Sequence, residues 1–327
     1  MKSLLLIIAL LVPMVLFSEQ KQKIILDCDF GGDLDDAFAV ALVLSSPEFD
    51  VLGFVMDHGN TPLRARTILK MLYETGKESI PVYVGHPTPN IVGVDKDIAG
   101  PSYQFSWSEG FEKVNPAKGD AAEFIVRTLN KYPGEVILFT VGPVCNIKEV
   151  IARDTDALKR AKRIVSMFGS YYVGYGGTPA IDAEWNVRAD IAAAKVFTQC
   201  GANIVYAGLD VTTMVKLNEA NRMRLLMRQS PLTNALCGLY SLWLYEPFAA
   251  PDPTLHDVVA ISAVLWPDLF TSHKAFVNVD DKGYTLVDER KEPNCEILTK
   301  VNTEELLKRI MERLLKQNLG RENHLMK

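Results

Sequence analysis

The chain has 327 residues, of which 48% are hydrophobic and 23% are charged, and its formal net charge is -5. This balance is typical of a globular protein with enough apolar material for a large core. The negative net charge gives no basic footprint for a nucleic acid backbone, so we expect no nucleic acid partner.

The first 18 residues have the pattern of a secretory signal peptide. Lys2 gives a positive start, residues 4–17 are almost purely apolar, and the small residue Ser18 precedes a polar stretch. The apolar run is short for a membrane span, and an uncleaved membrane anchor is the alternative. We therefore expect an exported protein, periplasmic or secreted, in which residues 19–327 form a single domain.

The predicted elements then alternate between short apolar runs and helical patterns. We predict strands over residues 24–26, 51–56, 82–84, 135–141, 163–168 and 203–207. Between them we predict helices over residues 35–44, 62–73, 119–130, 146–152 and 191–199. This alternation predicts an α/β fold in which an open, mostly parallel, Rossmann-like sheet is flanked by helices.

The C-terminal third is predicted to be more helical than the rest of the chain. Helical patterns cover residues 221–244, 257–265 and 303–316. Residues 276–279 and 284–286 flank a turn-forming sequence, which predicts a β-hairpin.

Five aspartates lie within ten residues directly after the first predicted strand: Asp27, Asp29, Asp33, Asp35 and Asp36. Carboxylates this close raise one another's pKa, and a fold tolerates them most easily around a hard cation. Oxygen ligands suit Ca²⁺ or Mg²⁺ rather than Zn²⁺. A solvated turn rich in Asp and Gly is the alternative. An EF-hand does not fit, because Phe38 stands where that loop needs its bidentate Glu.

Further polar or glycine-containing segments follow other predicted strands, at residues 57–60, 141–143 and 167–169. Ligands of an open α/β sheet bind at the carboxyl ends of its strands. We therefore expect these segments to lie near the aspartate cluster, although polar loops after strands are common.

Two later segments carry chemistry-bearing side chains. In an extended segment, Glu184 and Asn186 would point the same way, and a carboxylate beside an amide can hold a vicinal diol such as that of ribose. An ordinary polar loop with a packed Trp185 is the alternative. His256 and Asp257 precede an apolar helix, and such a pair suits metal ligation with proton donation. An Asp257 N-cap explains the same pair without chemistry.

Taken in order, these motifs resemble the nucleoside hydrolase family, of the inosine–uridine-preferring type. The resemblance extends from about Lys23 to beyond Ala260. One departure concerns the first motif, whose commoner family form is D-x-D-P-G-x-D-D-A. Here two residues are added and the Pro is replaced, so that Asp33 is an extra carboxylate with an open role.

The resemblance implies a role for each matching residue. Asp29 would be a Ca²⁺ ligand and also the base that orients the attacking water. Asp36, Asp257 and the main-chain carbonyl of Val141 would complete the Ca²⁺ ligands. His256 would protonate the leaving base. The ribose-contacting residues would be Asp35, Asn60, Met167, Glu184 and Asn186. The implied reaction is Ca²⁺-dependent hydrolysis of the N-glycosidic bond of a ribonucleoside, and the implied assembly is a homodimer or homotetramer.

Two other functions remain to be weighed. A haloacid-dehalogenase-type phosphatase also places D-x-D after its first strand, with Asp27 as nucleophile and Mg²⁺ as metal. That pattern needs Thr or Val where this chain has Gly31. The non-enzymatic alternative is an exported, Ca²⁺-dependent binder of nucleosides or sugars on the same fold.

Overall fold

The structure is a computed structural model that describes residues 21–89, 91–92, 97–98 and 102–321. The predicted signal peptide, residues 1–18, lies outside the described residues. Within the described ranges, no helix combines the length and the apolar character needed to cross a membrane.

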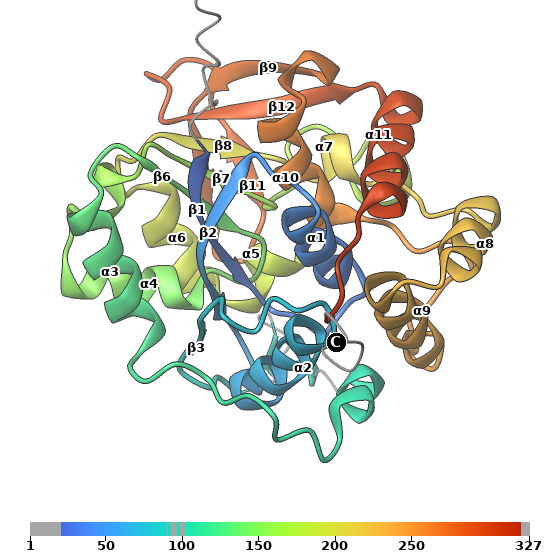
Figure 1. Ribbon diagram of the computed structural model, residues 1–327. Helices are drawn as coiled ribbons and strands as arrows, with labels where there is room; N and C mark the ends of the chain where they lie inside the picture. The colour runs from blue at the N-terminus through green and yellow to red at the C-terminus, as the bar shows by residue number, and fades with distance from the viewer. Residues whose placement is uncertain (1–20, 90, 93–96, 99–101, 322–327) are drawn as a thin grey trace, which may run out of the picture.

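A central sheet organises the molecule (Figure 1). Among the described residues its eight strands are, in spatial order, β3 (Val82–Val84), β2 (Phe49–Met56), β1 (Gln22–Cys28), β6 (Val136–Thr140), β7 (Arg163–Ser166), β8 (Ile204–Tyr206), β12 (Cys295–Val301) and β9 (Phe270–Ala275). Neighbouring strands are parallel except β12 and β9, which are antiparallel. The predicted open, mostly parallel α/β sheet is therefore confirmed.

Helices cover both faces of this sheet (Figure 1). One core contains buried residues of α1 (Asp35–Leu44), α2 (Thr61–Glu74), α8 (Glu219–Arg228), α9 (Pro231–Trp243), α10 (His256–Leu265) and α11 (Thr303–Lys316). The other contains buried residues of α3 (Ala121–Lys131), α4 (Cys145–Arg153), α5 (Trp185–Ala189) and α6 (Ile191–Thr198). Short elements connect these layers: α7 (Leu209–Thr212), η1 (Tyr103–Ser108), η2 (Ala157–Arg160), η3 (Tyr175–Gly177), η4 (Pro267–Leu269) and the strand pairs β4 (Ile91–Val92) with β5 (Asp97–Ile98) and β10 (Val277–Val279) with β11 (Thr285–Val287).

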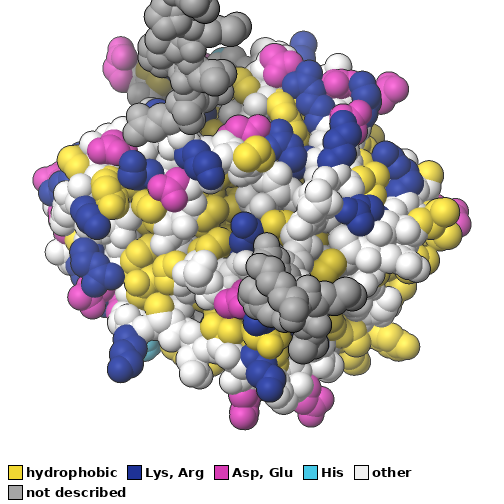
Figure 2. Space-filling view, in the orientation of Figure 1, with side chains coloured by type: hydrophobic (Ala, Val, Ile, Leu, Met, Phe, Trp, Pro, Cys, Tyr) yellow, Lys and Arg dark blue, Asp and Glu magenta, His cyan; other side chains and the backbone are white. Residues whose placement is uncertain are grey.

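The position of β1 follows from its composition. Ile24, Ile25 and Leu26 are consecutive and fully buried, because a parallel strand covered on both faces needs apolar side chains on both. Burying each such side chain contributes about 1.5–3 kcal/mol. The buried apolar run of β1 places the aspartates that follow it at the carboxyl edge of the sheet. On the outer face seen in Figure 2, charged side chains are intermixed with other types.

One prediction for the C-terminal third is corrected, and two strands there were not predicted. The single helix predicted over residues 221–244 is two helices, α8 and α9. Gln229 has φ 51°, and Ser230 forms a capping box with Thr233 at the start of α9. The strands β12 and β9 at the edge of the sheet were not predicted, and the largely exposed, polar pattern of β9 lacks an apolar run. The hairpin of β10 and β11 is confirmed.

The capping box predicts a measurable stability effect. We expect Ser230→Ala to lower the free energy of unfolding by about 1 kcal/mol, because the amide of Thr233 loses its acceptor. Ser241→Ala, on the exposed side of the same helix, is the control and should change it by less. Urea unfolding of both variants would test this, and equal effects would contradict it.

Candidate active site

Segments from several parts of the chain meet at the carboxyl edge of the sheet. Backbone hydrogen bonds continue between strand ends, from Asp57 to Cys28, from Val141 to Asp27 and from Met167 to Thr140. These bonds hold the loops after β1, β2, β6 and β7 side by side. The predicted convergence of these loops is thus observed, and the site is built on their first residues.

Three buried carboxylates form a group that could hold a metal ion. One oxygen each from Asp35, Asp36 and Asp257 lies within 4.8 Å of the others. The first two belong to the first turn of α1 and the third to the first turn of α10. These two helices pack against each other, so their N-terminal ends bring positive dipole ends to the carboxylates.

The electrostatics of this group favour a bound cation. Burial, and next the repulsion of neighbouring aspartates, holds the pKa of Asp35, Asp36 and Asp257 well above the usual range. Asp36 Oδ1 is buried and has no hydrogen-bond partner. An oxygen-only donor set with an unpartnered oxygen fits a hard cation such as Ca²⁺ or Mg²⁺.

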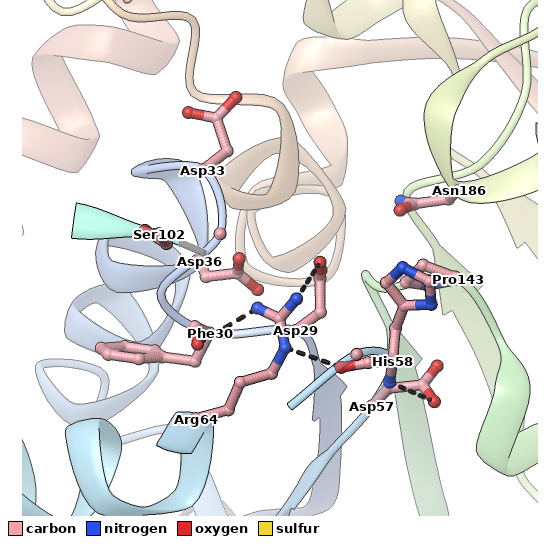
Figure 3. A network of polar contacts seen from close by, with 12 residues as sticks. Asp29, Phe30, Asp33, Asp36, Asp57, His58, Arg64, Ser102, Pro143 and Asn186 are labelled. Atoms are coloured by element: carbon pink, nitrogen blue, oxygen red, sulfur yellow. Dashed lines mark hydrogen bonds and ion pairs between the residues drawn. The ribbon is translucent and has the colours of Figure 1, made fainter. Parts of the chain in front are cut away.

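Asp29 lies beside this group and outside it. Its carboxylate follows the end of β1, and Oδ2 lies 3.4 Å from an Nη atom of Arg64 (Figure 3). Its other oxygen, Oδ1, would be 3.2 Å from a Cβ at Gly142, so a larger residue there would crowd the carboxylate. Asp29 is near enough to raise the pKa of Asp36 and Asp257 by repulsion.

Two further acidic residues serve the fold. Asp57 accepts hydrogen bonds from the amides of Cys145 (2.9 Å) and Asn146 (3.1 Å), and so caps α4 from another part of the chain. Burial raises the pKa of Asp57 to about 7. Asp27 is buried within β1, where its Oδ1 accepts a hydrogen bond from the side chain of Asn146 at 2.9 Å.

The backbone is extended at Glu184, where φ is -61° and ψ is 145°, whereas Asn186 already lies in α5. Glu184 is the N-cap of α5, and its carboxylate accepts the amides of Asn186, Val187 and Gly169. Burial raises the pKa of Glu184 to about 7, and these three amides oppose the rise. An N-cap residue has a non-helical backbone and bonds the amides of the helix that follows, so Glu184 and Asn186 do not share one continuous extended segment.

Asn186 joins the ends of β6 and β7. Its side-chain nitrogen donates to the carbonyl oxygens of Val141 (2.9 Å) and Met167 (3.0 Å). Met167 is buried beside it, with its sulfur 3.4 Å from the same nitrogen. The carbonyl of Val141 that we predicted as a metal ligand is therefore already a hydrogen-bond acceptor.

Asn60 and His256 occupy different environments. Asn60 is exposed and caps α2, accepting the amide of Leu63 at 3.1 Å. His256 Nδ1 lies 2.8 Å from the hydroxyl of Thr212, and the ring meets Tyr175 edge-on at 6.2 Å. Burial, and secondly the charge of Lys216, lowers the pKa of His256 to about 4, so the ring is neutral near pH 7.

Arg64 was not among the predicted site residues, but its side chain is buried at the centre of the network in Figure 3. A signal was available in the helical spacing. Arg64 precedes Ile68 by four residues, which places it on the apolar face of α2. A charged residue on such a face needs a buried partner, and here the partner is Asp29.

Comparisons with known proteins show the family of the chain. The family model described as "Inosine-uridine preferring nucleoside hydrolase" matches residues 24–308. The chain belongs to this family. It is 30% identical to uridine nucleosidase 1 of Arabidopsis thaliana over 280 residues, covering 82% of each chain. It is 29% identical to the pyrimidine-specific ribonucleoside hydrolase RihA of Citrobacter koseri, over 89% of this chain and 97% of the relative.

Solved structures share the fold. A plant nucleoside hydrolase, PpNRh1, superposes with a TM-score of 0.78 at 24% identity, covering 91% of this chain and 100% of that one. A purine-preferring ribonucleoside hydrolase from Gardnerella vaginalis gives 0.75 at 22% identity, covering 90% and 98%.

Family membership makes the chain a hydrolase of the nucleoside N-glycosidase class. It sets aside the phosphatase alternative, whose nucleophile would be Asp27. That carboxylate is 1% exposed and is held by Asn146 inside the sheet, where it cannot attack a substrate.

The repulsion within the cluster predicts how charge removal affects stability. We expect Asp36→Asn to melt at or above the wild-type temperature in chelator, because one repelling buried charge is gone. Ca²⁺ at about a hundred times its Kd should stabilise the wild type by about 2.7 kcal/mol, and the variant much less. Thermal unfolding with EGTA and with Ca²⁺ measures both quantities.

The exposed residue Asp50 provides the matched control. Asp50→Asn should retain the full response to Ca²⁺. If Ca²⁺ stabilised the Asp36→Asn variant as much as the wild type, Asp36 would not be a ligand of the cation.

Proposed function

We propose that this protein is a Ca²⁺-dependent ribonucleoside hydrolase that releases ribose and free base. The observation that carries the proposal is the buried group of Asp35, Asp36 and Asp257 beside Asp29, at the carboxyl edge of the sheet of a nucleoside hydrolase. The resemblance assigns the ligands Asp29, Asp36, Asp257 and the Val141 carbonyl, and the geometry adds Asp35 as a candidate.

The reaction involves two atoms of the N-glycosidic bond, the anomeric carbon that water attacks and the nitrogen of the departing nucleobase. When bound, a hard cation lowers the pKa of a nearby water and so favours a nucleophile at neutral pH. Asp29 accepts the proton of the water whose oxygen bonds to the anomeric carbon. The carbon–nitrogen bond breaks with its electron pair going to the base, through an oxocarbenium-like transition state. The clustered carboxylates stabilise the positive charge that develops on the ribose.

His256 is assigned to the departing base. Because its pKa of about 4 leaves the imidazole neutral, we assign it a hydrogen bond to the base rather than a resident proton. The Thr212 hydroxyl contacts Nδ1, which leaves Nε2 as the ring nitrogen for this contact. The proton that completes the free base then comes from solvent.

The ribose hydroxyls are assigned to Asp35, Asn60, Glu184 and Asn186, with Met167 packing against the sugar. These assignments rest on the resemblance. The helix-capping bonds of Glu184 and Asn60 use part of their hydrogen-bonding capacity, since a carboxylate has about four lone-pair sites and an amide keeps its donors. The named relatives differ in base, from uridine to purines, so a panel of bases is needed.

Ribose release from inosine, uridine, adenosine and guanosine tests the function. With protein lacking residues 1–18, we expect ribose release that chelator abolishes and added Ca²⁺ restores. Asp29→Asn should lose nearly all activity because the proton acceptor is gone, and Asp50→Asn should keep it. His256→Ala should slow release by roughly 10²-fold, because a hydrogen bond to the departing nucleobase is lost.

Other outcomes would contradict parts of this proposal. Saturable nucleoside binding without product would favour the non-catalytic binder. Ribose release that is insensitive to chelator would show that the reaction needs no bound cation. Full activity of His256→Ala would show that His256 does not assist the departing nucleobase.

Export and self-association complete the proposal. The apolar leader of residues 1–18 supports export, and the resemblance supports a homodimer or homotetramer. N-terminal sequencing of protein recovered outside the cytoplasm should begin near Glu19, and an intact Met1 in the recovered protein would indicate an anchor instead. Sedimentation of the purified protein measures the assembly, and a monomer would contradict it.

A further inference from the structure

Arg64 reaches the site from the first turns of α2 and is anchored by two backbone carbonyls. Its Nε donates to the carbonyl of His58 at 2.8 Å, and Nη1 donates to the carbonyl of Phe30 at 3.3 Å. Its remaining terminal nitrogen, Nη2, lies 3.4 Å from Asp29 Oδ2. Figure 3 shows the guanidinium between these three groups.

The surroundings of the guanidinium leave it little freedom. The Arg64 side chain is only 8% exposed, and the ring centroid of Phe105 lies 6.0 Å from the guanidinium carbon. Two of its three polar partners are main-chain atoms at fixed strand and loop ends. A planar guanidinium held in this way presents its third edge in one direction.

Asp29 is the one side chain among these partners, so the orientation of its carboxylate is coupled to the anchored guanidinium. Arg64 Nη2 forms an ion pair with Oδ2, while Oδ1 is on the side of Gly142 at the end of β6. The positive charge also opposes the repulsion in the cluster, since it favours the ionised form of Asp36. A carboxylate oriented before the substrate arrives needs no rearrangement during the reaction.

We infer that Arg64 is the positioning residue of Asp29, fixing one carboxylate oxygen so that the other faces the reacting water. This inference rests on the proposed function, in which Asp29 takes the proton from that water. Arg64 acts through Asp29 and does not itself touch the substrate.

The test compares Arg64→Ala and Arg64→Lys with the wild type. We expect Arg64→Ala to lower kcat by about 10²-fold with KM changed less than about threefold. The reason is that a misplaced Asp29 carboxylate, as the proton acceptor, slows the chemical step. Arg64→Lys keeps the charge but lacks the planar fork, and should also lose kcat. Guanidinium ion at millimolar concentration should restore kcat of Arg64→Ala at least about tenfold, since it can occupy the vacated space.

Two readouts separate positioning from a structural role. Arg66→Ala, on the same helix with its Nε on Ser108 Oγ, is the matched control and should keep wild-type kcat without any response to guanidinium. In calorimetric titration, Arg64→Ala should bind Ca²⁺ within about threefold of the wild type or more tightly, because a positive charge near the cation site is removed.

Each contrary result overturns the inference in a distinct way. Near wild-type kcat in Arg64→Ala excludes the positioning role, as does the same result in Arg64→Lys if the alanine variant fails to fold. If Ca²⁺ binding and kcat were lost together, Arg64 would act by supporting cation binding rather than by positioning Asp29. Wild-type protein that releases no ribose overturns the proposed function, and this inference with it.

Discussion

The repulsion among buried carboxylates is the constraint on which the rest of the site depends. Four of the aspartates that follow the core of β1 are buried, and the chain then adds Asp57, Glu184 and Asp257 from distant positions. A buried charge without a partner is very costly, so each carboxylate must find backbone donors, a counter-charge or a proton. The architecture at the carboxyl edge of the sheet can be understood as the set of partners that meets this requirement.

The partners are of two kinds, and they separate the acidic residues by role. Asp57 and Glu184 receive backbone amides at the starts of α4 and α5, so their charges stabilise the loops that form the walls. Asp29 receives the guanidinium of Arg64. Asp36 keeps a buried oxygen without a partner, and burial, followed by the charges of its neighbours, raises its pKa. The residual negative charge is therefore concentrated where a cation and a developing oxocarbenium ion would be stabilised.

How far sequence reasoning succeeds depends on the range of the interaction concerned. The alternation of strands and helices was predictable because the periodicity of each element is local, and the aspartate cluster because its members are adjacent. The single helix over residues 221–244 was wrong, since apolar periodicity continues through a Ser-Pro pair that starts a new helix. At Glu184 the backbone is extended, but its carboxylate caps the helix in which Asn186 lies. In both segments a capping side chain, rather than the surrounding pattern, determines where a helix begins.

The sequence by itself determined the α/β order of elements, the placement of an acidic cluster after the first strand and the family of the chain, all of which are carried by residues close together or in a recognisable order. Only the tertiary structure decided which carboxylates remain available. Arg64 lies 35 positions from Asp29, and Asp257 lies 222 positions from Asp35, to whose carboxylate its amide donates. Such pairings depend on where loops and helix ends meet across the sheet, and no local pattern specifies that meeting.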